Sequence, residues 1–141
     1  MSVAGGPYVA LAVLCQRVDL QPDGSADLIG IVDGLSVDAP ADSDTPPLVL
    51  NVRAVVALRA GSVRGPRRVS LRGRFPSGSE GLSADKTVLF SDDRPAITLN
   101  MPLELELPET GTYVFEVLCD GNMLTAITLD VQQRGPVPLT H

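Results

Sequence analysis

"GTYVFEVLCDGNMLTAITLDV", residues 111–131, holds two alternating apolar runs on either side of an Asp-Gly pair. Alternation at a period of two predicts half-buried strands, and Asp-Gly between them predicts a tight hairpin. The apolar residues of both strands fall at odd positions, so residues that face each other must have numbers with an even sum. A two-residue turn gives an odd sum. We therefore predict a three-residue loop over 119–121, in which Leu118 pairs with Asn122 and Gly121 takes a left-handed conformation.

The same alternation recurs along most of the chain, with turn residues about every ten positions. It predicts strands at 8–18, 26–37, 48–60, 67–75, 87–90, 96–107, 112–118 and 123–131. The first is apolar on both faces, as in a central or doubly covered strand. Pro102 has no N–H, so its strand is predicted to lie at a sheet edge or to bulge there. Seven or eight such strands predict one antiparallel Greek-key, immunoglobulin-like β-sandwich, with a closed barrel as the alternative.

Length and composition fit a single domain. The chain has 141 residues, of which 44% are apolar, but only 4% are aromatic and none is Trp. The core must therefore consist mainly of Leu, Val, Ile and Ala. We predict the sandwich over 1–131 and a polar, Pro-containing tail over 132–141. No run is long enough to span a bilayer and no basic residue precedes the N-terminal apolar run, which favours the cytoplasm.

Few residues suited to catalysis are present. The one histidine is His141, and two cysteines are too few for a thiolate metal site. We predict no cofactor and no enzymatic activity, because a base at the chain end is poorly held. The predicted topology puts Cys15 about 23 Å along its strand from the 119–122 hairpin. We therefore expect no disulfide between Cys15 and Cys119, but free, buried thiols.

Asp33 is the one polar residue predicted on an apolar strand face, together with Ile29, Ile31, Leu35 and Val37. It is either a carboxylate in a functional pocket or an acceptor for backbone N–H groups at a bulge beside Gly34.

Basic residues are concentrated in one part of the chain. Seven of the ten arginines lie between 53 and 74, and no acid lies between 45 and 79. If strands 48–60 and 67–75 pair, one outer face becomes strongly basic. The residues proposed for this surface are Arg53, Arg59, Arg64, Arg67, Arg68, Arg72 and Arg74.

Three interpretations of these charges stay open. The basic surface is simply solvated, with Arg72 or Arg74 paired to Glu104 or Glu106 on a neighbouring strand. Alternatively it docks on an acidic protein surface, or the acidic loops bind calcium. A polyanion is a further ligand for the arginines, although the net charge of −6 argues against a general nucleic-acid binder.

The acids gather in predicted loops. In an alternating sandwich, loops 38–47, 76–95 and 119–122 fall at the same end, opposite the tip that holds Arg64. The weak calcium candidates are Asp42, Asp44, Asp92 and Asp93. Their spacing matches no known calcium loop.

Two stretches resemble a known family. They are "ALAVLCQRVDLQPDGSADLIGIVDGLSV" at 10–37 and the hairpin at 111–131. The chain resembles a family of small uncharacterised bacterial β-sandwich proteins, a domain of unknown function. The resemblance implies a fold and no mechanism.

Taken with the charges, these features predict a non-catalytic protein-interaction or structural module. Its partner is another protein or copies of itself, bound through the basic surface and the acidic loops. The alternative is a ligand- or calcium-binding β-sandwich.

Overall fold

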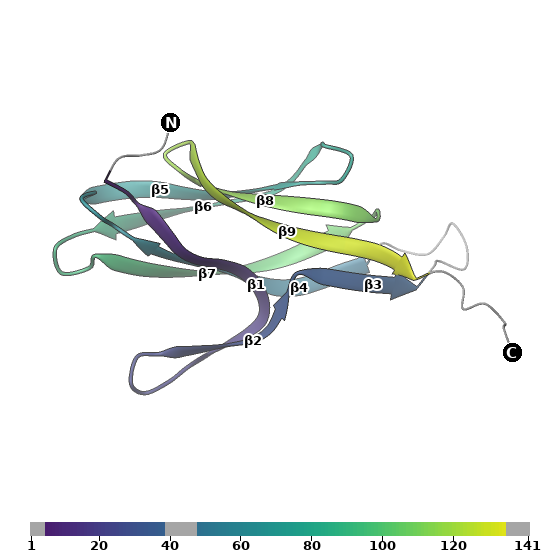
Figure 1. The fold of residues 1–141 in the computed structure, drawn as a ribbon, viewed down its shortest axis with the longest axis horizontal. Helices are drawn as coiled ribbons and strands as arrows, with labels where there is room; N and C mark the ends of the chain where they lie inside the picture. Colours follow the sequence, from purple (N-terminus) through teal and green to yellow (C-terminus); the bar gives the residue numbers. More distant parts are fainter. Residues whose placement is uncertain (1–4, 39–47, 135–141) are drawn as a thin grey trace, which may run out of the picture.

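The computed structural model describes residues 5–38 and 48–134, which form nine strands and no helix. The strands make two sheets that face each other as two layers (Figure 1). Sheet A has the order β2 (Ala26–Val32), β1 (Tyr8–Leu20), β4 (Leu48–Arg59) and β7 (Ala96–Leu107). Sheet B has the order β3 (Gly34–Asp38), β9 (Asn122–Arg134), β8 (Gly111–Cys119), β5 (Gly65–Arg74) and β6 (Glu80–Phe90). The predicted all-β, immunoglobulin-like sandwich is confirmed.

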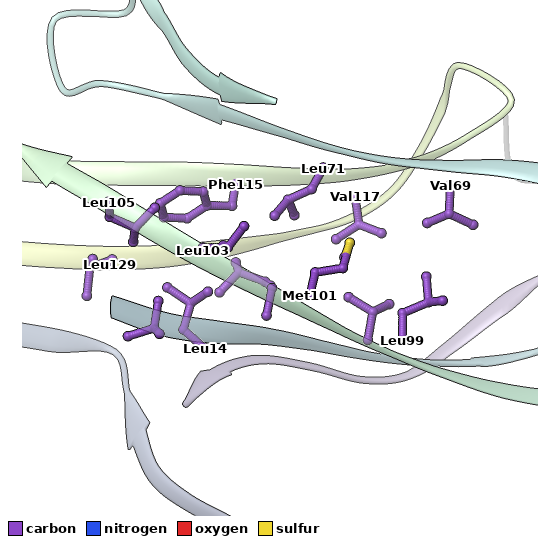
Figure 2. Close-up of a cluster of buried hydrophobic side chains, with 14 of the residues drawn as sticks. Leu14, Val69, Leu71, Leu99, Met101, Leu103, Leu105, Phe115, Val117 and Leu129 are labelled. Carbon is purple, nitrogen blue, oxygen red and sulfur yellow. The ribbon is translucent and has the colours of Figure 1, made fainter. Parts of the chain in front are cut away.

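The core follows from the period-two alternation. In β7 every odd residue from Leu99 to Leu107 is buried, whereas the even residues are exposed. Figure 2 shows these side chains meeting Val69, Leu71 and Val117 of the opposite sheet. Each fully buried Leu or Val contributes about 1.5–3 kcal/mol relative to an exposed one. Alternation therefore both forms the strands and joins the layers.

Residues 26–37 were predicted as one strand, and this is wrong. The chain leaves sheet A after Val32 and enters sheet B at Gly34, where β3 pairs with β9. This pair is parallel, because the crossing strand keeps its direction as it changes layer. Ile31 consequently lies on the outer face of sheet A and is 58% exposed, although the alternation had placed it inside.

The segment predicted as a loop at 76–86 is mostly strand. β6 begins at Glu80, so the residues that lack apolar alternation still pair with β5. An edge strand tolerates them because its outer side is not covered. This added strand separates the turn at 76–79 from the turn at 91–95, which lie at opposite ends of the sandwich (Figure 1).

The β8–β9 hairpin has the predicted register but not the predicted turn. Phe115 faces Ile127, an even sum, while Cys119 faces Asn122 across a two-residue turn. The two turn residues have φ of 48° and 85°, as a type I′ turn requires. A shift in pairing between residues 117 and 118 restores the register instead. The same shift turns Met123 outward, where it is 60% exposed, and lets Leu124 pack on the core.

The strand that contains Pro102 is an edge strand, as predicted, because β7 pairs with β4 alone. At the other end of the domain, β9 runs to Arg134. Residues 132–134 therefore belong to the sandwich and not to the predicted tail.

Candidate functional site

The clustered arginines do not form one basic face. Strand β4 lies in sheet A between β1 and β7, whereas β5 lies in sheet B between β8 and β6. The connection that contains Arg64 crosses between layers, so Arg53 and Arg59 are in a different sheet from Arg72. The prediction that strands 48–60 and 67–75 pair is wrong. The arginines are close together in the sequence, but the sheet topology places them in two different sheets.

Five of these arginines form ion pairs within the domain. Nitrogen–oxygen distances are 2.7 Å for Arg64–Asp92, 3.6 Å for Arg67–Asp120, 2.5 Å for Arg68–Asp85, 3.1 Å for Arg72–Glu116 and 3.0 Å for Arg74–Glu116. Hydrogen bonds from Arg74 and Arg72 lower the pKa of Glu116 below its ordinary value. The predicted partners Glu104 and Glu106 lie instead in sheet A. The outer face of sheet B thus balances most of its own charge.

The acidic loops do not gather at one end. The turn that holds Asp92 and Asp93 lies at the same end as Arg64, and the Asp92 carboxylate accepts a hydrogen bond from that guanidinium. Asp42 and Asp44 lie outside the described residues. Among residues 5–38 and 48–134, no three carboxylate, thiol or imidazole groups are placed to share a metal ion.

Asp33 is exposed at the point where the chain changes sheet. Its backbone carbonyl accepts a hydrogen bond from the Asp130 N–H at 3.1 Å. The side chain lines a polar hollow of about 390 Å³ beside Ser36, Thr128 and Asp130. The predicted inward orientation is wrong, because residue 33 belongs to neither strand.

Both cysteines are free and buried, and their predicted burial is confirmed. Cys15 lies in sheet A opposite Arg53, whereas Cys119 ends β8 in sheet B. Burial raises the pKa of each thiol above its ordinary value. Both groups are therefore poor nucleophiles at neutral pH.

The outer face of sheet A carries exposed apolar side chains on two neighbouring strands, β1 and β2. Leu14 packs in the core, so Leu11, Val13 and Cys15, which follow the register shift between Val9 and Leu11, point outward. Leu11 is 40% exposed, and Ile31 lies beside Cys15 on the neighbouring strand. Ile29 continues this face along β2. We call Leu11, Val13, Ile29 and Ile31 the sheet A stripe. On this outer face β1 is exposed at Leu11 but fully buried at Cys15, so the predicted double cover of the first strand holds for only part of its length.

An apolar cleft of about 320 Å³ opens between the two sheets. One wall is edge strand β7 over 104–107, and the other comes from β5, β6 and β8. Phe75, Tyr113 and Phe115 supply aromatic rings, and Leu105 and Leu107 face them. Figure 2 shows Leu105 and Phe115 next to each other at one end of the core.

The aromatic side of the cleft is held rigidly. The Tyr113 hydroxyl donates to the Glu109 carbonyl at 2.6 Å and accepts from the Glu109 N–H at 3.1 Å. This is the tyrosine corner of immunoglobulin-like domains. The Phe75 ring stands edge-on to Tyr113, with centroids 5.8 Å apart. A Cβ at Gly81 would lie 2.9 Å from Phe75, so glycine is needed for the ring to sit there.

Sequence reasoning missed this cleft, although one signal for it was present. Val69 and Leu71 alternate inward along β5, and Gly73 occupies the next inward position, before Phe75 directly after the strand. Gly73 faces Phe115 on the neighbouring strand and contributes no side chain to the core. Gly73 and Leu105 line the same cleft. A gap in an otherwise regular apolar alternation was therefore the available signal.

The two layers, the tyrosine corner and the parallel β3–β9 pair define an immunoglobulin-like β-sandwich with an inter-sheet cleft. Residues 10–132 match the family of unknown function DUF6941, and the chain belongs to this family. The predicted resemblance is confirmed. No curated protein matches the chain at a significant level.

Two solved structures are similar in fold. An immunoglobulin-like protein from Pseudomonas aeruginosa is 12% identical with a TM-score of 0.38, over 87% of this chain and 98% of that one. The alkylpurine DNA glycosylase AlkC of Pseudomonas fluorescens, bound to DNA containing an abasic site analogue, is also 12% identical with a TM-score of 0.38. This similarity covers 86% of this chain and 30% of the glycosylase chain. The described residues contain no helix long and apolar enough to cross a membrane.

Proposed function

We propose that the protein is a non-catalytic interaction module that self-associates through the sheet A stripe. The observation that carries this proposal is the group of exposed apolar side chains on one face of sheet A, Leu11, Ile29 and Ile31. The half-buried Val13 and the buried Cys15 lie between them. Single exposed apolar residues are ordinary, but a contiguous patch marks a surface that another molecule covers. The free, buried thiols are compatible with a cytoplasmic protein, which is the compartment we propose.

A second copy of the chain is the partner we infer. Edge strand β2 continues the stripe, and its residues 28–32 carry no charge. The other edges differ: β7 contains Pro102, β6 contains Lys86, and β3 has only five residues. Such features protect edges from pairing. Residues 28–32 can face their own copy across a two-fold axis without opposing like charges, which an isologous contact requires.

The five ion-paired arginines are weaker candidates for this interface. Each would have to leave an acid within the domain before it could bind a partner. Exposed ion pairs contribute only about 0–1 kcal/mol each, so exchange is feasible but gives little net affinity.

Light scattering across a range of concentrations tests the proposal. We expect a dimer that persists between low and high salt, because an apolar contact is not screened. The pair Leu11→Asp and Ile31→Asp should convert it to a monomer. The matched variant Arg67→Gln/Arg72→Gln should leave the dimer intact.

Two results would overturn this assignment. A monomer at every concentration would exclude a second copy as the partner. The dimer could instead dissociate in high salt or in the arginine variant while the Asp variants remain dimeric. That result would show that the interface is formed by the arginines.

A further inference from the structure

The inter-sheet cleft adjoins edge strand β7, which has backbone N–H and C=O groups without a partner strand in the described part of the chain. Among residues 5–38 and 48–134, β7 pairs with β4 alone, and residues 104–107 of its other side line the cleft. Proline is accepted in an edge strand where its nitrogen faces the free side. The backbone N–H and C=O groups of successive residues in a strand point to alternate sides. Glu104 and Glu106 therefore have the same backbone orientation as Pro102. Their N–H and C=O groups point away from β4. An apolar cavity and an unpaired strand edge therefore run side by side.

The β7 wall of the cleft also carries acids, whereas Arg74 lies on the opposite wall. Glu104 and Glu106 are exposed on the outer face of β7. Within the described ranges, no Lys or Arg lies within ion-pair distance of either carboxylate. By contrast, Glu116 on the other sheet holds two arginines. The two rim acids are therefore available to a cation from outside the domain.

We propose that the cleft and the free edge of β7 bind an extended segment of a partner protein, in which large apolar side chains alternate with Lys or Arg. Addition of a strand to an exposed edge is an established mode of peptide recognition, with main-chain bonds for affinity and pockets for alternate side chains. This site is separate from the sheet A stripe and does not depend on self-association.

The alternation follows from sheet geometry. A strand added beside β7 continues sheet A, so its side chains point alternately to the inner and outer faces. Inward side chains enter the cleft opposite Phe75 and Phe115. Outward side chains align with Glu104 and Glu106, where opposite charge is favoured and like charge is disfavoured. The site thus favours a partner segment with apolar residues at every second position and basic residues at the positions between them.

The probe for this site is the acetylated, amidated heptapeptide Thr-Lys-Leu-Lys-Leu-Lys-Thr, with a control peptide in which Glu replaces each Lys. We expect the Lys peptide to bind about tenfold or more tightly than the Glu peptide, because cross-strand charges set specificity. Titration calorimetry gives the affinities. Amide chemical shifts of ¹⁵N-labelled protein should change at residues 104–107 and at Gly73 and Gly81.

Variants separate the two parts of the site. Glu104→Lys/Glu106→Lys should reverse the preference between the two peptides. Asp93→Lys, an acid reversal away from the cleft, should not. Gly73→Leu fills the cleft and should weaken the Lys peptide about tenfold or more, since its inward side chains lose their space. Gly73→Ala serves if the larger change prevents folding, and should weaken binding less.

Three outcomes would refute the proposal. They are equal binding of both peptides, shifts confined to residues outside the cleft, and no binding of the Lys peptide at millimolar concentration. A second copy in place of the peptide would be revealed if Gly73→Leu altered the oligomeric state. Loss of peptide binding with an intact dimer would leave the sheet A proposal untouched.

Discussion

The outer faces of the two sheets differ in how far their side chains find partners within the domain. On sheet B, Arg72 and Arg74 share the Glu116 carboxylate, and Thr112 donates to Asp130 at 2.6 Å. On sheet A, Leu11 and Ile31 face outward and are 40% and 58% exposed. The arginines of the charged segment that lie in sheet B therefore belong to the more self-contained face. A docking surface is better located by what remains unsatisfied than by where charge is dense.

The inner faces of the two sheets, unlike the outer ones, should be equally sensitive to truncation of a buried side chain. Leu14 of sheet A and Leu71 of sheet B are both fully buried. Leu14→Ala and Leu71→Ala should each lower the free energy of unfolding by about 2–5 kcal/mol, because each leaves a cavity in a packed core. Urea denaturation of both variants checks this. A loss below about 1 kcal/mol in either one would mean that its layer packs loosely.

Removal of the tyrosine corner should have the next largest effect. Tyr113→Phe keeps the ring beside Phe75 but leaves the N–H and C=O groups of Glu109 without their partner. We expect a loss of about 1–3 kcal/mol in unfolding free energy. Tyr8→Phe is the matched control, since Tyr8 is 52% exposed and should change stability by less than about 0.5 kcal/mol. Equal effects of the two changes would contradict the structural role of the corner.

The ion pairs of sheet B should give a smaller, pH-dependent effect. Hydrogen bonds from Arg74 and Arg72 lower the pKa of Glu116 from its ordinary value of 4.5. A carboxyl with a lowered folded-state pKa stabilises the protein above its unfolded pKa, and this contribution disappears as the pH falls through the folded pKa. Glu116→Gln should therefore lower the melting temperature at pH 7 and have little effect near pH 3. Parallel melting curves for wild type and variant across this range would disprove the coupling.

Substitutions in the sheet A stripe should affect folding least. Ile31→Thr should change the unfolding free energy of the dissociated chain by less than about 0.5 kcal/mol, because the side chain is 58% exposed. Thermal melts at low protein concentration, where the chain is monomeric, check this. A large loss in the monomer would mean that Ile31 packs within the domain, and the stripe would lose its status as a free surface.

Much of the fold could be predicted from local patterns. The odd apolar residues of β7, the edge position required by Pro102 and the even register of the last hairpin were all predicted correctly. Each depends on a rule that acts within one strand or between adjacent strands. Boundaries were less accurate where side chains gave no alternation, as at Glu80.

The site was harder to predict because it joins residues that are distant in sequence. Gly73 and Leu105 meet across the cleft only because β5 and β7 belong to opposite sheets. Likewise, Arg68 and Asp120 were predicted on separate surfaces, yet the backbone N–H of Arg68 donates to the Asp120 carboxylate at 3.0 Å. A sequence pattern contains no information on which layer a strand joins.

By itself the sequence determined most of the strands, the inner faces of β5, β7 and β8, and the family, because period-two alternation and turn residues act locally. Only the tertiary structure decided that the chain changes sheet at Asp33, that the arginine cluster is divided between layers, and that Gly73 lines a cleft beside β7. The physical reason is that strand exchange between sheets depends on the packing of the entire core. Two segments with identical alternation can join either layer, and the free-energy difference between those arrangements is summed over many distant contacts.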